Sequence, residues 1–153
     1  MINYDVKKII KKSVLCWLAT SNKHNEPNVS PKEIFTFKDE NTLLIANIAS
    51  PISIQNIKEN PNVCVSFVDI FIQKGFKIKG VASLINIGNE GFNSKLKLLT
   101  DLFSDKFPIN IIIEVTVKSM ETILAPSYFL FPETTEQSQI ESALKTYKVK
   151  FIE

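Results

Sequence analysis

The sequence contains no arginine: all 18 basic residues are lysines, and 16 acidic residues nearly balance them. The formal net charge of +2 is too small to favour nucleic acid or an anionic membrane surface as the main partner. Because no guanidinium group is present, any anion that a side chain binds must be held by the point charge of a lysine ammonium. We therefore expect no nucleic-acid partner and no membrane partner.

Histidine and glycine are also scarce, which excludes several kinds of catalytic and binding site. The one histidine, His24, lies in a polar turn without a predicted carboxylate neighbour, so a Ser-His-Asp or Cys-His arrangement is disfavoured. Cys16, His24 and Cys64 form neither a CxxC nor an HxxxH pattern, which predicts no metal site. The four glycines match neither a P-loop nor the GxGxxG motif of a Rossmann fold.

The two cysteines lie far apart inside apolar runs, which indicates buried, reduced thiols and a cytoplasmic location. No run approaches the roughly 18 apolar residues of a membrane-spanning helix. Residues 1–12 lack the apolar segment of a signal peptide, so we expect the protein to stay where it is made. A length of 153 residues, 44% of them hydrophobic, predicts one globular domain over residues 1–153.

Apolar periodicity predicts a mainly β protein of the α+β class, with an antiparallel barrel or sheet and packed helices. Helical spacing is found in the first dozen residues (Ile2, Val6 and Ile9), after Pro51, from Phe92 to Phe103, and from Ile140 to Phe151. Six strands are expected, linked by short turns or interrupted by helices, at residues 14–20, 29–37, 42–49, 62–72, 75–87 and 109–117.

One pattern favours an anion. In the strand over residues 29–37, alternation places Lys32 on the same side as Ser30 and Ile34, and Pro31 predicts an edge or a bulge. Ser50 and Pro51 form a helix-start signal after the buried strand 42–49, with the serine hydroxyl expected to cap the helix. Free amides at this helix start, together with Lys32, could hold a phosphate. The alternative is a simple helix cap and a solvated lysine.

The region from Leu18 to Ile85 contains LATSNKHNEPNVSPKEIFTF, LLIANIASPISIQNIKENPNVCVSFVD and GFKIKGVASLI in this order. It resembles the pyridoxamine 5'-phosphate oxidase-like family of FMN-binding split barrels. The resemblance implies a six-stranded antiparallel split β-barrel with peripheral helices, which agrees with the strands predicted above. It also implies a homodimer that binds one FMN per subunit between the two chains.

The resemblance further implies which residues contact the cofactor. The phosphate would be held by Lys32, Ser50 and Ser53, and the isoalloxazine ring would lie along the end of the third strand. Gln73, Lys74 and Gly75 would come from the partner subunit. The strand residues implied against the ring are Ile45, Ala46, Asn47 and Ile48.

The sequence also departs from the oxidases of this family. Ile52 and Ser53 stand where those enzymes carry an arginine and a lysine, and the tail YKVKFIE has no group to grip a substrate phosphate. We therefore expect an FMN-dependent oxidoreductase whose unknown small-molecule substrate is not pyridoxamine phosphate. A non-catalytic flavin carrier or redox sensor is one alternative. Another is a dimeric interaction module that holds haem, a deazaflavin or no cofactor, with His24 as the only imidazole for a haem.

Overall fold

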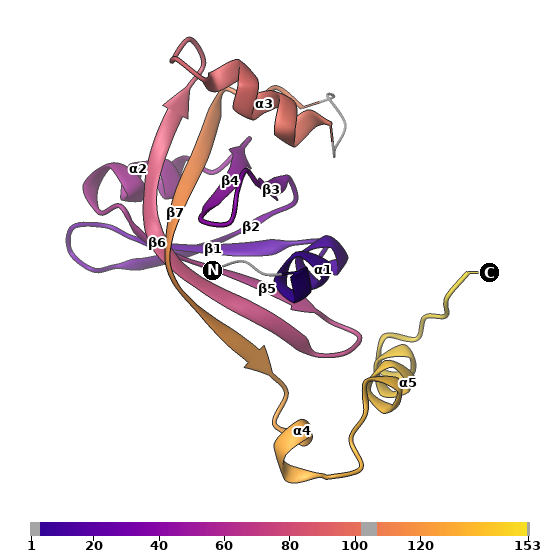
Figure 1. Cartoon of the computed structure of the whole chain (residues 1–153). Coiled ribbons are helices and arrows are strands. Elements are labelled where there is room, and N and C mark those ends of the chain that lie inside the picture. The colour runs from indigo at the N-terminus through magenta and orange to yellow at the C-terminus, as the bar shows by residue number, and fades with distance from the viewer. Residues whose placement is uncertain (1–3, 102–106, 153) are drawn as a thin grey trace.

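The structure, a computed structural model, describes residues 4–101 and 107–152. Seven strands form one sheet in the order β2-β1-β5-β6-β7-β4-β3, and every neighbouring pair is antiparallel. The sheet curls into a half-barrel (Figure 1), which confirms the predicted split-barrel class. The strands are β1 (Cys16–Ser21), β2 (Pro27–Lys32), β3 (Phe35–Phe37), β4 (Thr42–Asn47), β5 (Asn62–Asp69), β6 (Lys74–Asn86) and β7 (Ile111–Leu124).

The predicted strand over residues 29–37 is two strands, so the described sheet has seven strands rather than six. β2 pairs with β1 and β3 pairs with β4, and these pairs lie at opposite edges of the sheet. In the link between β2 and β3, the carbonyl of Ile34 accepts a hydrogen bond from the amide of Ala46 at 2.9 Å. Pro31 has no amide to donate, and the chain passes from one edge to the other directly after it.

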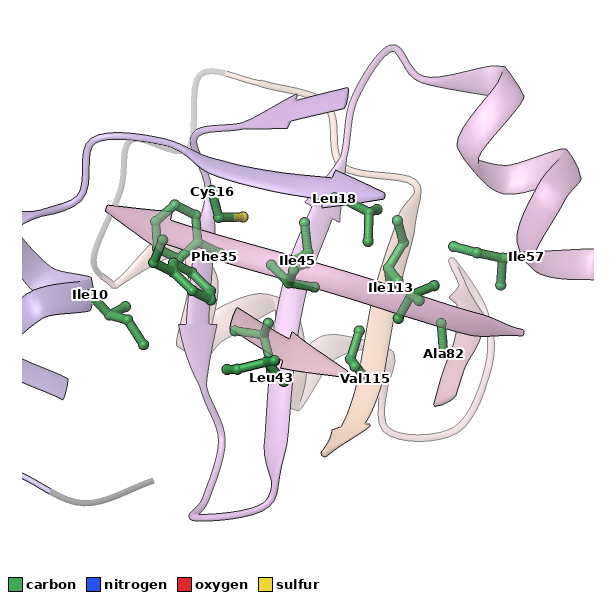
Figure 2. Packing of buried hydrophobic residues seen from close by; sticks show 14 of the residues in the cluster. Ile10, Cys16, Leu18, Phe35, Leu43, Ile45, Ile57, Ala82, Ile113 and Val115 are labelled. Carbon is green, nitrogen blue, oxygen red and sulfur yellow. The ribbon is translucent and has the colours of Figure 1, made fainter. Parts of the chain in front are cut away.

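The core lies on both faces of β4, as its continuous apolar sequence predicts. Leu43 and Ile45 belong to a cluster shared with α1 and β5, whereas Leu44 and Ala46 belong to a second cluster under α3. Figure 2 shows Ile45 surrounded by side chains of the first cluster. The end of β4 is therefore held rigidly from two sides.

Five helices are described: α1 (Tyr4–Lys12), α2 (Pro51–Glu59), α3 (Phe92–Thr100), α4 (Ser127–Leu130) and α5 (Glu136–Tyr147). Four of them confirm the predicted helices, whereas α4 is not predicted. Phe151 follows α5, and Ile2 and Phe103 lie outside the described residues. None of the helices in the described ranges has the length and apolar character that crossing a membrane requires.

Residues 125–152, here called the C-terminal arm, extend beyond the end of β7 and away from the sheet (Figure 1). The arm contacts the turn between β5 and β6. Tyr128 Oη donates to the carbonyl of Ile72 at 2.8 Å, and Lys74 pairs with Glu136 at 2.8 Å. The arm also exposes a group of large apolar side chains, which are Phe129, Leu130, Phe131, Phe151 and Ile152.

Candidate functional site

Polar side chains meet where β2 ends, β4 ends and α2 begins. Lys32 is the last residue of β2, Asn47 is the last residue of β4, and Ser50 is the N-cap of α2. The Lys32 ammonium donates to Ser50 Oγ at 2.5 Å and lies 3.5 Å from Asn47 Oδ1. Ser30 Oγ is 2.9 Å from Ser50 Oγ. Three segments that are separate in the sequence thus form one group, which we call the Lys32 cluster: Ser30, Lys32, Asn47 and Ser50.

Lys32 is the only charged residue of the Lys32 cluster, and it is only 5% exposed. Burial lowers the pKa of its ammonium, because removing the charge from water disfavours the protonated form. Its hydrogen-bond partners are neutral, and it forms no ion pair with any residue in the described ranges. A buried cation without a counter-ion is costly. The cluster therefore carries a positive charge that no carboxylate of the described residues balances.

The Ser50 hydroxyl does not act as the helix cap that the sequence predicts. It is directed to Lys32 and Ser30 instead of to the amides of α2, because the nearby ammonium is the stronger partner. The first-turn amides of α2 add positive potential at the same place. One turn further on, Ser53 is fully buried and accepts a hydrogen bond from Asn28 Nδ2 at 3.4 Å.

An open cavity of about 460 Å³ adjoins the Lys32 cluster. Lys32 and Ser50 lie at its polar side, whereas Ile34, Ala46 and Ile48 supply apolar wall. The arrangement combines a cation and hydroxyls with an apolar surface, and these are the features that hold a phosphorylated, flat organic molecule.

The structure brings most of the predicted contact residues together. Lys32, Ala46, Ile48 and Ser50 line the cavity, and Asn47 contacts Lys32. Ile45 is placed differently, since its side chain is fully buried in the core and its backbone pairs with β3 on one side and with β7 on the other.

The predicted partner-subunit segment does not join the cluster within this chain. Gln73 is the last residue of the turn between β5 and β6, and Lys74 and Gly75 are the first residues of β6. The Gln73 carbonyl accepts from the Ala125 amide at 3.1 Å, and Lys74 is bound to Glu136. Their contact with the cofactor of a partner subunit stays a prediction.

The fold adds several residues to the site that are not among those predicted. Ser30 and Asn28 are on the same side of β2 as Lys32, and Glu33 and Ile34 line the cavity. The two-residue alternation of Ser30, Lys32 and Ile34 was the available signal.

The other reactive side chains do not belong to the Lys32 cluster, although Cys16 is the strand partner of Lys32. His24 is exposed in the turn between β1 and β2, and Cys16 is fully buried, where desolvation raises its pKa to about 12. Cys64 is half-buried, so the prediction of two buried thiols holds only for Cys16. In the described part of the chain, no group of His, Cys, Asp and Glu side chains could hold a metal ion.

Comparison with solved structures shows the same fold in several proteins. HupZ of Group A Streptococcus is 20% identical, with a TM-score of 0.70, and the likeness covers 82% of this chain and 96% of HupZ. An FMN-binding protein of Syntrophomonas wolfei subsp. wolfei is 14% identical, with a TM-score of 0.66 and coverages of 78% and 84%. HutZ, the haem storage protein of Vibrio cholerae, is 15% identical, with a TM-score of 0.65 and coverages of 80% and 94%.

These identities show a shared fold and not a shared ligand. No curated protein matches the sequence. The family described as pyridoxamine 5'-phosphate oxidase matches residues 2–101, a range that contains β1 to β6, α1 to α3 and the whole Lys32 cluster. The chain therefore belongs to the pyridoxamine 5'-phosphate oxidase family.

Proposed function

We propose that this protein binds FMN at the Lys32 cluster and serves as a flavin-dependent oxidoreductase. The phosphate would lie against Lys32, Ser30 and Ser50 at the start of α2. The single observation that supports this most is the buried Lys32 ammonium, whose partners in the described residues are all neutral. A phosphate would supply the missing counter-charge.

The adjoining cavity fits the other half of the cofactor. Ile34, Ala46 and Ile48 offer an apolar surface for the isoalloxazine ring, and residues 48–49, which follow β4, line the same cavity. When bound, FMN would supply hydride or electron transfer. The protein's own contribution would be to fix the phosphate by charge and to orient the ring along residues 46–49.

We further propose that a second copy of the chain completes the site. The cavity is open, and exposed apolar side chains (Val29, Ile48 and Ile52) lie on the elements around it. A homodimer would cover these side chains and could bring Gln73, Lys74 and Gly75 of the second copy to the flavin. This dimer also agrees with the resemblance on which the residues were first selected.

Haem is the less favoured ligand, although one protein of the same fold is a haem storage protein. The one imidazole of the chain, His24, is exposed and is not among the residues that line the cavity. A lysine and two hydroxyls without an imidazole suit a phosphate better than an iron ligand.

The first experiment is a titration of the purified full chain with FMN, followed by quenching of flavin fluorescence. We expect wild type and Lys58→Gln, a surface control on α2, to bind equally, and Lys32→Gln to bind at least tenfold more weakly, on the order of one lost charged hydrogen bond. Equal binding by Lys32→Gln, or no binding by wild type, would contradict the proposed site.

A second measurement separates an enzyme from a flavin carrier. Under anaerobic conditions, NADH or NADPH is added to the FMN-loaded protein, and the flavin absorption is followed with and without electron acceptors. Reduction followed by reoxidation on an acceptor supports the oxidoreductase. A flavin that no donor reduces would indicate the carrier.

A further inference from the structure

A second and larger cavity, of about 930 Å³, lies between α1 and β3. Most of its wall is apolar: Ile10 and Val14 come from α1 and the segment after it, Phe35 and Phe37 come from β3, and Phe107 also lines the cavity. Figure 2 shows Ile10 and Phe35 side by side at this end of the core. The cavity is large enough for a small aromatic molecule, and it is distinct from the cavity beside the Lys32 cluster.

The charged groups at this cavity are mainly cationic. Lys7 and Lys11 are one turn apart on α1, and both line the cavity and are exposed. Neither forms an ion pair with any side chain of residues 6–101 and 107–152. Glu33 is the one carboxylate on the wall, so two ammonium groups face one carboxylate.

The other two lysines of α1 differ from this pair. Lys12 lies 3.8 Å from the buried carboxylate of Asp69. The pKa of Glu136 is lowered mainly by its hydrogen bond to Lys74, and the charges of Lys12 and Lys8 add a smaller effect in the same direction. Neither of them lines the cavity. The helix thus directs one pair of lysines to existing carboxylates and the other pair to the cavity.

The two cavities share a wall. Glu33 and Ile34 line the large cavity, and they also line the smaller one beside the Lys32 cluster. A ring bound along residues 33–34 and 46–49 would therefore have the large cavity as its neighbour on the β3 side. Reactants in flavin enzymes must contact the ring, so adjacency is the property that a substrate site needs.

From these observations we infer that the cavity between α1 and β3 is the substrate site, and that its substrate is an organic anion with a flat apolar body. The apolar body would contact Phe35, Phe37 and Ile10, while the anionic group would bind Lys7 and Lys11. Sugars fit less well, because six of the eleven lining residues are apolar and would leave many sugar hydroxyls without partners. The role of the cavity as a substrate site rests on the proposed FMN site. The binding of an anion in the cavity rests only on the cavity and its lysines.

The test uses two fluorescent probes of the same shape, 1-pyrenebutyrate and its neutral counterpart 1-pyrenebutanol. Binding to the full chain is measured by fluorescence anisotropy, with and without bound FMN. We expect the anion to bind about tenfold more tightly than the alcohol, and Lys7→Gln/Lys11→Gln to remove that preference. Equal binding of the two probes by wild type would overturn the inference.

The matched control is Lys8→Gln/Lys12→Gln, which removes the same charge from the same helix. It should keep the preference for the anion; a loss equal to that of Lys7→Gln/Lys11→Gln would show a general charge effect and overturn the site. FMN titrations of both double variants separate this inference from the proposed function. If FMN fails to bind but the preference for the anion remains, the proposed flavin function and the role as a substrate site are wrong. If FMN binds but no preference for the anion is found, only the proposed anion site in the cavity is wrong.

Discussion

The ammonium of Lys32 donates a hydrogen bond to the hydroxyl of Ser50, a residue 18 positions later in the sequence and the N-cap of α2. This contact joins the edge strand β2 to the start of the helix. It also turns the serine away from the capping role that its position would normally give it. The consequence is a helix start whose amides and whose neighbouring cation remain available to a ligand, at some cost to the stability of the chain without ligand.

Replacing Lys32 with methionine should weaken FMN binding and yet preserve or raise the stability of the ligand-free protein. Burial lowers the Lys32 pKa below 10.5, so the unfolded chain holds that proton more tightly than the folded chain does. The charged lysine therefore costs the folded state stability below its folded pKa. This cost is relieved as the pH rises towards 10.5, where both states lose the proton.

The measurement is the melting temperature of ligand-free wild type and Lys32→Met from pH 7 to pH 10. We expect the variant to melt at the same or a higher temperature at pH 7, with its advantage decreasing at higher pH. A variant that is less stable at pH 7 would show that Lys32 serves the fold and not a ligand.

Ser50→Asp should stabilise α2 and abolish FMN binding. A carboxylate at the N-cap would pair with Lys32 and with the helix amides, adding about 0.5 to 2 kcal/mol to the free energy of unfolding. The same charge would occupy and repel the place of the phosphate. Thr135→Asp is the matched control, because Thr135 is the N-cap of α5, far along the chain in the C-terminal arm. Urea unfolding and FMN titration should separate the two variants, and FMN binding by Ser50→Asp at wild-type affinity would refute the assignment.

The two thiols should differ in reactivity. Burial raises the pKa of Cys16 to about 12 against a small opposing effect of the nearby Lys32, and burial also raises the pKa of the half-buried Cys64. Iodoacetamide at pH 8 should therefore modify Cys64 slowly and leave Cys16 unmodified until the protein unfolds. Peptide mass spectrometry over time gives both rates. Labelling of the two cysteines at one rate would contradict the packing of β1.

Gly75→Ala should destabilise the protein more than Gly88→Ala. A Cβ at Gly75 would lie 2.0 Å from the carbonyl oxygen of Phe67 on the paired strand, so β5 and β6 would have to separate, at about 3 kcal/mol. Gly88 has open space around it but a φ of +88°, and its substitution should cost about 1 kcal/mol. Urea unfolding of both variants measures the two losses of unfolding free energy. A smaller loss for Gly75→Ala than for Gly88→Ala would show that the Gly75 segment is loosely packed.

The sequence predicted those features that depend on neighbouring residues. The start of α2 follows from Ser50 and Pro51, and its end follows from Asn60 and Pro61, because capping and the proline ring act locally. The burial of β4 on both faces follows from its uninterrupted apolar residues. Ser30 was placed on the side of Lys32 by simple alternation.

Features that depend on distant partners were missed. The break after Lys32 arises because β2 and β3 pair with strands at opposite edges of the sheet, and no signal within residues 29–37 states which partners they take. The direction of the Ser50 hydroxyl depends on Lys32 being close in space. The large cavity combines α1, β3 and Phe107, which are widely separated in the sequence.

The C-terminal arm has a consequence for the proposed homodimer that a single subunit does not show. Through Tyr128 and Glu136 the arm contacts the segment between the end of β5 and the start of β6, which contains Gln73 and Lys74. In the proposed homodimer this segment would serve the flavin of the other subunit. Truncation of the C-terminal arm in one subunit would then impair the flavin site of the other subunit. Mixed dimers of full-length and truncated chains should therefore contain one intact flavin site and one impaired flavin site.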